Sequence, residues 1–293
     1  MDAVFFYSAV LGLGTALSFG FADFLVKVAL GRADFRTVLF GAIVLSLPLS
    51  AATVLVLDPA VPPSLFSPAI IVIILASNAL GAASWYLFFR AVEKGRVSVV
   101  SSLAALYALV TVFLGIAFLS EPMSPFLAVA ACLAAAGTVL AGSETGGGGL
   151  PVFGTGLEVR YGLSAAALFG VATFLSVIVV RAIGPYWDML AGRLLLAAFF
   201  LALFHKPVVH ALPRLFFGKH AVELLAIAVL YWLAPLLANI SFKVGTPSVS
   251  TPVAATSPVF TALLGIFVLR ERLSRAQLAG IAMVVAAIVL ISI

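Results

Sequence analysis

Charged side chains are scarce in this sequence. Asp, Glu, Lys and Arg together make up 9% of its 293 residues, against about 25% in ordinary soluble domains. Hydrophobic residues make up 64%. A water-soluble protein of this size needs more charge to cover its surface, whereas helices that face lipid need none. The composition therefore excludes a soluble globular protein and predicts an integral membrane protein.

The motifs on which many enzymes depend are also missing. No HExxH, GxSxG or P-loop pattern occurs, and all three histidines lie in or beside one connection at 205–220. The single cysteine, Cys132, excludes an internal disulfide. Basic residues are scattered among short loops rather than gathered in a patch, which argues against a nucleic-acid partner. We expect no enzymatic activity, no cofactor and no metal site.

Long apolar runs, by contrast, are abundant. Cutting the chain at charges, prolines and glycines leaves ten segments of about the length that a spanning helix requires. They lie near 4–28, 37–57, 68–89, 97–119, 125–142, 161–183, 186–204, 221–242, 248–269 and 275–293. A Gly-rich stretch at 144–156 separates the fifth from the sixth and is typical of a flexible linker. The predicted fold is all-α, with ten transmembrane helices.

The two parts of the chain repeat one another. Residues 150 positions apart are identical at many places without a gap, including glycines, serines, threonines and a glutamate. Examples are Gly12/Gly162, Gly20/Gly170, Ser98/Ser248, Thr111/Thr261 and Glu121/Glu271. We therefore predict one five-helix repeat at 1–143 and a second at 157–293. Because five is odd, the second repeat enters the membrane inverted, as in many secondary transporters.

The orientation follows from the basic residues. Thirteen of the 16 Lys and Arg lie in the connections between helices 1–2, 3–4, 5–6, 7–8 and 9–10. The opposite side carries Arg181 and Lys243, and Arg193 falls inside a helix. By the positive-inside rule the first side is cytoplasmic and both termini lie outside. We expect a multi-pass protein of the plasma membrane, or of the inner membrane in a Gram-negative cell.

Two sequence signatures resemble a known transporter family. Each half opens with GxxxAxxxG, at Gly12 and at Gly162, and the fourth helix of each half ends in the pattern G…SV…AA…T..LGI..L.E..S. With two five-helix halves, the chain resembles the EamA-type branch of the drug/metabolite transporter superfamily. The resemblance implies a central cavity between the halves, lined chiefly by the helices at 68–89, 97–119, 221–242 and 248–269. Its members carry amino acids, sugars, drugs and other metabolites, so the resemblance leaves the substrate open.

Two features depart from that family pattern. The arginine that the family tends to carry in the second helix of a half is present as Arg193, whereas the first half has Ile43. The helix at 248–269 contains Pro252 and Pro258, which free backbone carbonyls, and the helix at 97–119 has no proline at the equivalent positions. We expect these prolines to break the later helix and to contribute to gating.

Arg193 is the strongest single candidate for substrate binding. An arginine at the centre of a bilayer costs about 2.5–3.5 kcal/mol or more unless it has a partner. Two explanations fit the sequence equally well. The guanidinium binds a carboxylate or phosphate of the substrate, or its role is structural. In the structural case it binds carbonyls that the prolines free in the helix at 248–269, or it extends past Trp187 and Asp188 towards the membrane surface.

Asp23 and Lys27 are spaced for an ion pair within the first helix. A structural pair is the favoured interpretation, and a proton-coupling role for Asp23 is the alternative. A looser group combines aromatic rings and polar groups that suit a cavity for an organic solute. It comprises Asn78, Trp85, Tyr86, Tyr107, Thr111, Tyr231, Trp232, Asn239, Thr256 and Ser257.

The duplicated glutamates have a simpler, local interpretation. Glu121 and Glu271 each precede a helix start, where a carboxylate interacts favourably with the helix dipole. Ser274 and Gln277 form a capping-box pattern at the start of the last helix.

The function expected from these features is secondary transport of a small organic metabolite, such as an amino acid or a drug-like solute, by alternating access. The resemblance favours export. A lipid flippase or scramblase is the alternative. The expected partners are the solute and membrane lipids, and one chain supplies both halves, so a functional monomer is expected.

Overall fold

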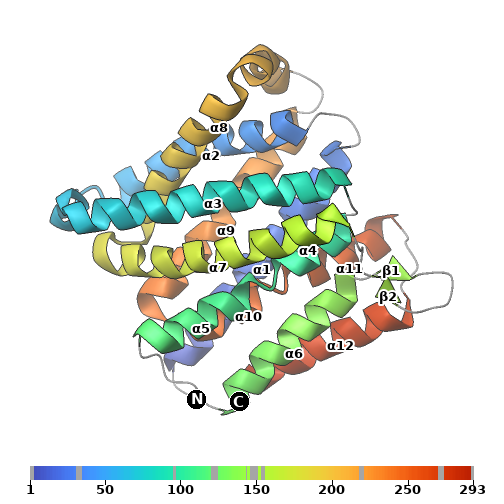
Figure 1. Ribbon diagram of the computed structural model, residues 1–293. Helices are drawn as coiled ribbons and strands as arrows, with labels where there is room; N and C mark the ends of the chain where they lie inside the picture. The colour runs from blue at the N-terminus through green and yellow to red at the C-terminus, as the bar shows by residue number, and fades with distance from the viewer. Residues whose placement is uncertain are drawn as a thin grey trace.

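The chain folds into a bundle of α-helices (Figure 1). The computed structural model describes residues 3–30, 35–94, 97–119, 125–142, 144–145, 151–152, 156–217, 221–269 and 274–291. The first half contains α1 (Ala3–Leu30), α2 (Phe35–Leu57), the 3-10 helix η1 (Pro63–Phe66), α3 (Pro68–Lys94), α4 (Val97–Ala104), α5 (Tyr107–Leu119) and α6 (Pro125–Gly142). The second contains α7 (Leu157–Ile183), α8 (Pro185–Phe217), α9 (Ala221–Val244), α10 (Pro247–Ala254), α11 (Ser257–Leu269) and α12 (Arg275–Ile291).

The predicted linker contains a small element of β-structure. Strands β1 (Glu144–Thr145) and β2 (Pro151–Val152) pair antiparallel, with Glu144 opposite Val152. The linker therefore contains some regular structure. Its Gly-rich composition did not indicate this.

Most of the bundle is suited to a membrane. Seven helical stretches of the described chain are long and apolar enough to cross a bilayer, and the helices at Pro125–Ala141 and Arg275–Ile288 are apolar but shorter. Large apolar side chains also cover the outside. Phe113, Phe118, Phe126, Val222 and Phe267 are each 68% or more exposed, as lipid-facing residues are.

The two halves run through the bundle in opposite senses. Figure 1 places both chain ends at one end of the bundle and the β1–β2 hairpin, which joins the halves, at the other. The first half thus traverses the bundle from one end to the other and the second half returns. This is the relation that an inverted repeat requires.

Both long helices predicted at 97–119 and 248–269 are broken in the middle. In the first half the Ala105 amide donates to the Ser101 carbonyl at 3.0 Å, and the next amide, Leu106, turns to Leu103 at 3.2 Å. The equivalent amides of the second half, Ala255 and Thr256, make the equivalent bonds at 2.9 and 3.1 Å. The break expected in the later helix is therefore present, whereas the prediction of one continuous helix at 97–119 is wrong.

The break in the first half does not depend on proline. The second half has Pro258 just after its break, whereas the first half has Ala108 there and turns at the same place. Ala105, Ala108 and Ala255 pack together as one buried cluster, so the two breaks meet in the core. Small side chains at both breaks permit this contact between the halves.

The halves are interleaved rather than placed side by side. The most extensive helix contacts join α3 to α7, α6 to α12, α1 to α9 and α2 to α8, and each of these pairs crosses between the halves. The core that supports the fold is therefore shared by both repeats.

The glycines of the GxxxAxxxG stripes account for some of this interleaving. A Cβ atom at Gly20 would lie 2.8 Å from the Ser257 carbonyl oxygen, and one at Gly170 would lie 2.8 Å from that of Tyr107. Only glycine allows these close approaches of α1 to α11 and of α7 to α5. Two hydroxyls reinforce them, because Thr261 donates to the Gly20 carbonyl at 3.1 Å and Thr111 to that of Gly170 at 3.0 Å.

The capping box at the start of α12 is confirmed. The Gln277 side chain accepts from the Ser274 amide at 2.9 Å, and the Ser274 hydroxyl accepts from the Gln277 amide at 3.2 Å. Glu121 and Glu271, for which a dipole role was predicted, lie outside the described residues.

Candidate functional site

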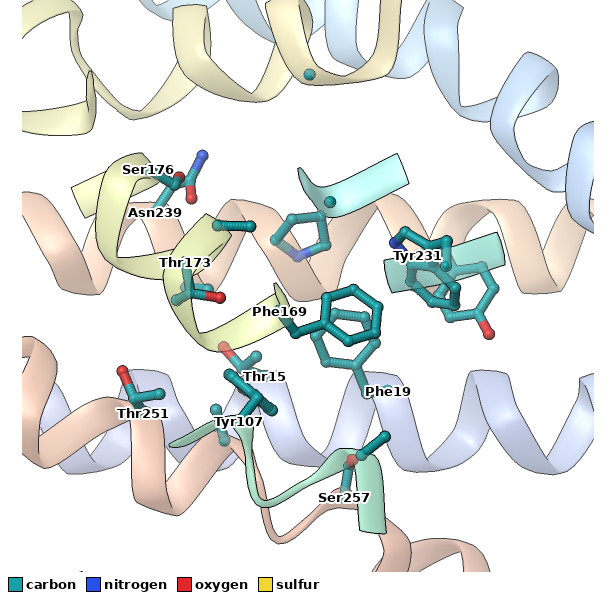
Figure 2. A pocket seen from close by; sticks show the side chains of 18 of the residues that line it. Thr15, Phe19, Tyr107, Phe169, Thr173, Ser176, Tyr231, Asn239, Thr251 and Ser257 are labelled. Carbon is teal, nitrogen blue, oxygen red and sulfur yellow. The ribbon is translucent and has the colours of Figure 1, made fainter. Parts of the chain in front are cut away.

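A cavity of about 320 Å³ lies between the two halves. Its lining includes residues from α1 to α5 and from α7 to α11, whereas α6 and α12 contribute none among the described residues. Figure 2 shows Phe19 and Phe169 across its middle, with Tyr231 toward one end and Ser176 and Asn239 toward the other. A volume of this size suits a small organic molecule.

Aromatic rings line the cavity from its middle to the end where Tyr231 lies (Figure 2). The Trp85 ring lies 5.4 Å from that of Phe169 and 5.9 Å from that of Tyr231, edge to face in both cases. The Phe19 ring lies 6.1 Å from that of Tyr231. Such contacts hold the rings in fixed orientations and leave a rigid apolar wall against which a flat group can pack.

Arg193 lines the cavity and bonds to a carbonyl that a proline has freed. Pro235 has no amide hydrogen, so the carbonyl four residues earlier in α9, that of Tyr231, lacks its usual helical donor. The Arg193 guanidinium donates to this Tyr231 oxygen. The acceptor therefore lies on α9, where Pro235 frees it, and not on the helix at 248–269, which was one of the partners that the sequence left open.

The Tyr231 hydroxyl extends this contact to α1. It donates to Asp23 Oδ1 at 2.9 Å. Arg193, Tyr231 and Asp23, which we call the Arg193 cluster, thus join α8, α9 and α1 beside the aromatic wall. The recorded partner of Asp23 is on another helix, so its pairing with Lys27 within α1 stays a prediction.

A second polar group, which we call the Asp188 cluster, lies in the second half. The Asp188 side chain is buried in the first turn of α8. Its Oδ2 atom accepts from the Ser176 hydroxyl at 2.8 Å and from the Asn239 amide at 2.9 Å. Asn239 also donates to the Pro185 carbonyl at 3.1 Å. All three side chains of the cluster line the cavity, and together they tie α7, α8 and α9 to one another.

The structure brings most of the predicted residues to this one cavity. Its lining includes Asp23, Asn78, Trp85, Tyr107, Arg193, Tyr231, Asn239, Ser257 and Pro258. They come from six helices and both halves of the chain. Substrate contact by any of them stays a prediction.

The other predicted residues are not among those that line the cavity, and several form hydrogen bonds within the protein instead. Thr111 bonds between the halves, as noted above, and the Thr256 hydroxyl donates to the Val253 carbonyl at 2.7 Å at the break after α10. The Trp232 indole donates to the Thr53 hydroxyl at 3.1 Å. Tyr86 is 37% exposed on α3. Lys27 and Pro252 are likewise not among the lining residues.

Comparison with known proteins identifies the family. The model of the EamA-like transporter family matches residues 6–143 and again residues 157–293. The chain belongs to the EamA-like transporter family. Membership of this family, within the drug/metabolite transporter superfamily, makes the protein a membrane transporter by descent and speaks against an enzyme.

The fold of this EamA-like transporter also occurs among solved structures. One, described as the crystal structure of a protein, has a TM-score of 0.76 at 17% sequence identity and covers 97% of this chain and 95% of its own. At that identity the likeness concerns the fold alone. No curated protein matches the chain.

Sequence reasoning about this EamA-like transporter missed several cavity residues. Asp188 and Ser176 were not among the candidates, nor were Phe19 and Phe169. A signal for Asp188 was present, because an acidic residue interrupts an apolar segment where the other repeat has Val38. The two phenylalanines carried no comparable signal, since a repeated apolar residue in a membrane helix is ordinarily a packing residue.

Proposed function

We propose that the protein is a secondary transporter that exports a small organic metabolite, such as an amino acid or a drug-like solute, by alternating access. One observation carries the proposal. A chain with very few charges keeps two carboxylates and a guanidinium in one cavity between its halves. Charged groups inside a membrane protein are costly and mark pathways for solutes or ions.

The inverted halves supply a means of alternating access. In transporters of this kind the site lies between the repeats and opens to either side as one repeat moves against the other. The broken helices contribute α4, α5, α10 and α11 around the cavity, and their buried alanine contact lies where the halves cross. Small residues at that contact favour repacking of one half on the other. Pro252 in α10 and Pro258 in α11 make the broken helix of the second half easier to bend.

The arrangement in the membrane follows from the same proposal. We propose ten crossings, with α4 and α5 sharing one and α10 and α11 another. The repeats extend over 1–143 and 157–293, joined by the linker at 144–156. The basic connections face the cytoplasm, both termini lie outside, and the protein acts as a monomer in the plasma membrane.

Counterflow in proteoliposomes tests the function. Vesicles with the purified protein are loaded in turn with unlabelled amino acids, sugars, nucleosides or organic anions, and entry of the matching labelled compound is followed. Saturable entry of one class is expected. Arg193→Ala should abolish it for solutes that carry an anionic group, while Arg275→Ala, a change outside the cavity at the start of α12, should not. Movement of labelled lipids without counterflow of any solute would overturn the proposal in favour of a flippase.

A further inference from the structure

The Asp188 cluster is present in one repeat only. The residues 150 positions before Ser176, Asp188 and Asn239 are Val26, Val38 and Phe89, and all three are buried. The first repeat thus closes the equivalent place with apolar side chains. Since the same helical framework forms without the polar cluster, the fold does not explain why the second repeat has it.

Asp188 also has no cationic partner among its recorded contacts. The side chain is 7% exposed, and its hydrogen bonds come from a hydroxyl and an amide, both neutral. Among the described lining residues the one guanidinium, Arg193, donates to the Tyr231 carbonyl. A buried carboxylate is stable when it is paired with a cation or fully hydrogen-bonded. Both recorded bonds end at Oδ2, so Oδ1 is the atom to which a cation would bind.

Among the described residues that line the cavity, the buried hydroxyls of Ser101, Ser250 and Thr251 lack a hydrogen-bond partner, and the last two are adjacent on α10. Ser250 is 2% exposed and Thr251 1%, and the oxygen of each has no partner within the described structure. Figure 2 shows the Thr251 side chain on the side of the pocket where Ser176 and Asn239 lie. Buried polar atoms are nearly always hydrogen-bonded in native proteins. These two hydroxyls therefore indicate a polar ligand in this part of the cavity.

We propose that the Asp188 cluster is a subsite for the protonated amino group of the transported solute. Ser176 and Asn239 hold the Asp188 carboxylate in place through Oδ2, and the ammonium group binds at Oδ1. The hydroxyls of Ser250 and Thr251 bind an uncharged polar part of the same molecule. The proposal rests on the proposed transport function and adds the chemical class of the substrate, a primary amine.

Matched pairs of solutes test this directly. Each pair consists of a primary amine and its N-acetyl derivative with the same carbon skeleton, which removes the positive charge. Counterflow is measured for the wild type, for Asp188→Asn and for Glu158→Gln, which removes a carboxylate outside the cavity. The wild type should carry the amine and discriminate against the N-acetyl partner at least about tenfold, as expected for loss of a hydrogen bond between charged groups. Asp188→Asn should raise the apparent KM for the amine at least about tenfold, and Glu158→Gln should leave it unchanged.

The outcomes separate this subsite from the transport function. If the wild type carries both members of every pair equally, the subsite is refuted while transport stands, and no variant is needed to reach that result. An unchanged KM in Asp188→Asn refutes it as well. If no solute moves, the transport function fails, and the subsite is judged by thermal unfolding in detergent. The amines should then raise the midpoint of the wild type and not that of Asp188→Asn, and the absence of any amine-specific increase overturns the proposal.

Discussion

The contact between Arg193 and the Tyr231 carbonyl can be tested by removing its cause. Pro235 deprives that carbonyl of its helical donor, and the guanidinium replaces the donor. In Pro235→Ala the new amide can donate to Tyr231 within α9, so the carbonyl no longer depends on Arg193. Arg193→Met should therefore be costly in the wild type and much less costly in the Pro235→Ala background.

The magnitude follows from the hydrogen bond involved. A bond from a charged donor contributes about 1.5–3 kcal/mol, and a buried carbonyl left unpaired costs about 1–3 kcal/mol. We expect Arg193→Met alone to lower the free energy of unfolding by about 2–3 kcal/mol. In the Pro235→Ala background the loss should fall to about 1 kcal/mol or less, which gives a coupling of about 1–2 kcal/mol.

The assay is equilibrium unfolding of the four proteins in detergent, followed by helical circular dichroism. Equal losses in the two backgrounds, within about 0.5 kcal/mol, would refute the reasoning. Counterflow of the double variant then separates the two roles predicted for Arg193. Recovery of transport together with stability would make the arginine structural, whereas a stable double variant that does not transport would identify it as a substrate contact.

Three further predictions concern helix packing, coupling and topology. Gly20→Ala should sharply lower the yield of folded protein, because the new Cβ would lie 2.8 Å from the Ser257 carbonyl oxygen. Gly81→Ala should not lower the yield, because no atom lies within 4 Å of a Cβ there. Equal yields of the two variants by size-exclusion chromatography would contradict this. Asp23→Asn should change transport driven by a pH gradient and solute exchange to the same extent in flux assays, as the favoured structural role of Asp23 predicts. Loss of the pH-driven transport alone would instead identify Asp23 as a proton-coupling carboxyl. Alkaline phosphatase fused to the C-terminus should be active, because the end of α12 is predicted to lie outside; an active cytoplasmic reporter there would reverse the topology.

Composition and repetition were sufficient for the coarse description because both can be read along the chain without knowing which helices are neighbours. Scarce charge requires lipid around the helices, and the identities between residues 150 apart require two equivalent halves. The glycines at 12, 20, 162 and 170 indicated close helix contacts, and Gly20 and Gly170 lie against backbone carbonyls of the other half. The capping box of α12 also involves only neighbouring residues, and it formed as its sequence predicts.

Contacts between segments far apart in the sequence could not be predicted from such patterns. Nothing in the residues around Arg193 shows that α9 lies beside α8, or that Pro235 offers a free carbonyl there. The partner of Asp23 is 208 residues away, on a helix of the other half. The same holds for Thr111, which resembles a cavity residue by its type and its neighbours but bonds to α7 instead.

The sequence by itself determined that this is a duplicated, largely helical membrane protein, since these properties depend on composition and period. Only the tertiary structure decided which polar groups share the cavity. Buried charges take their partners from whichever helices the packing places beside them, and in this protein those helices come from opposite halves of the chain. The helix break in the first half was likewise evident only in the tertiary structure, because that half has no proline at the turn to indicate it.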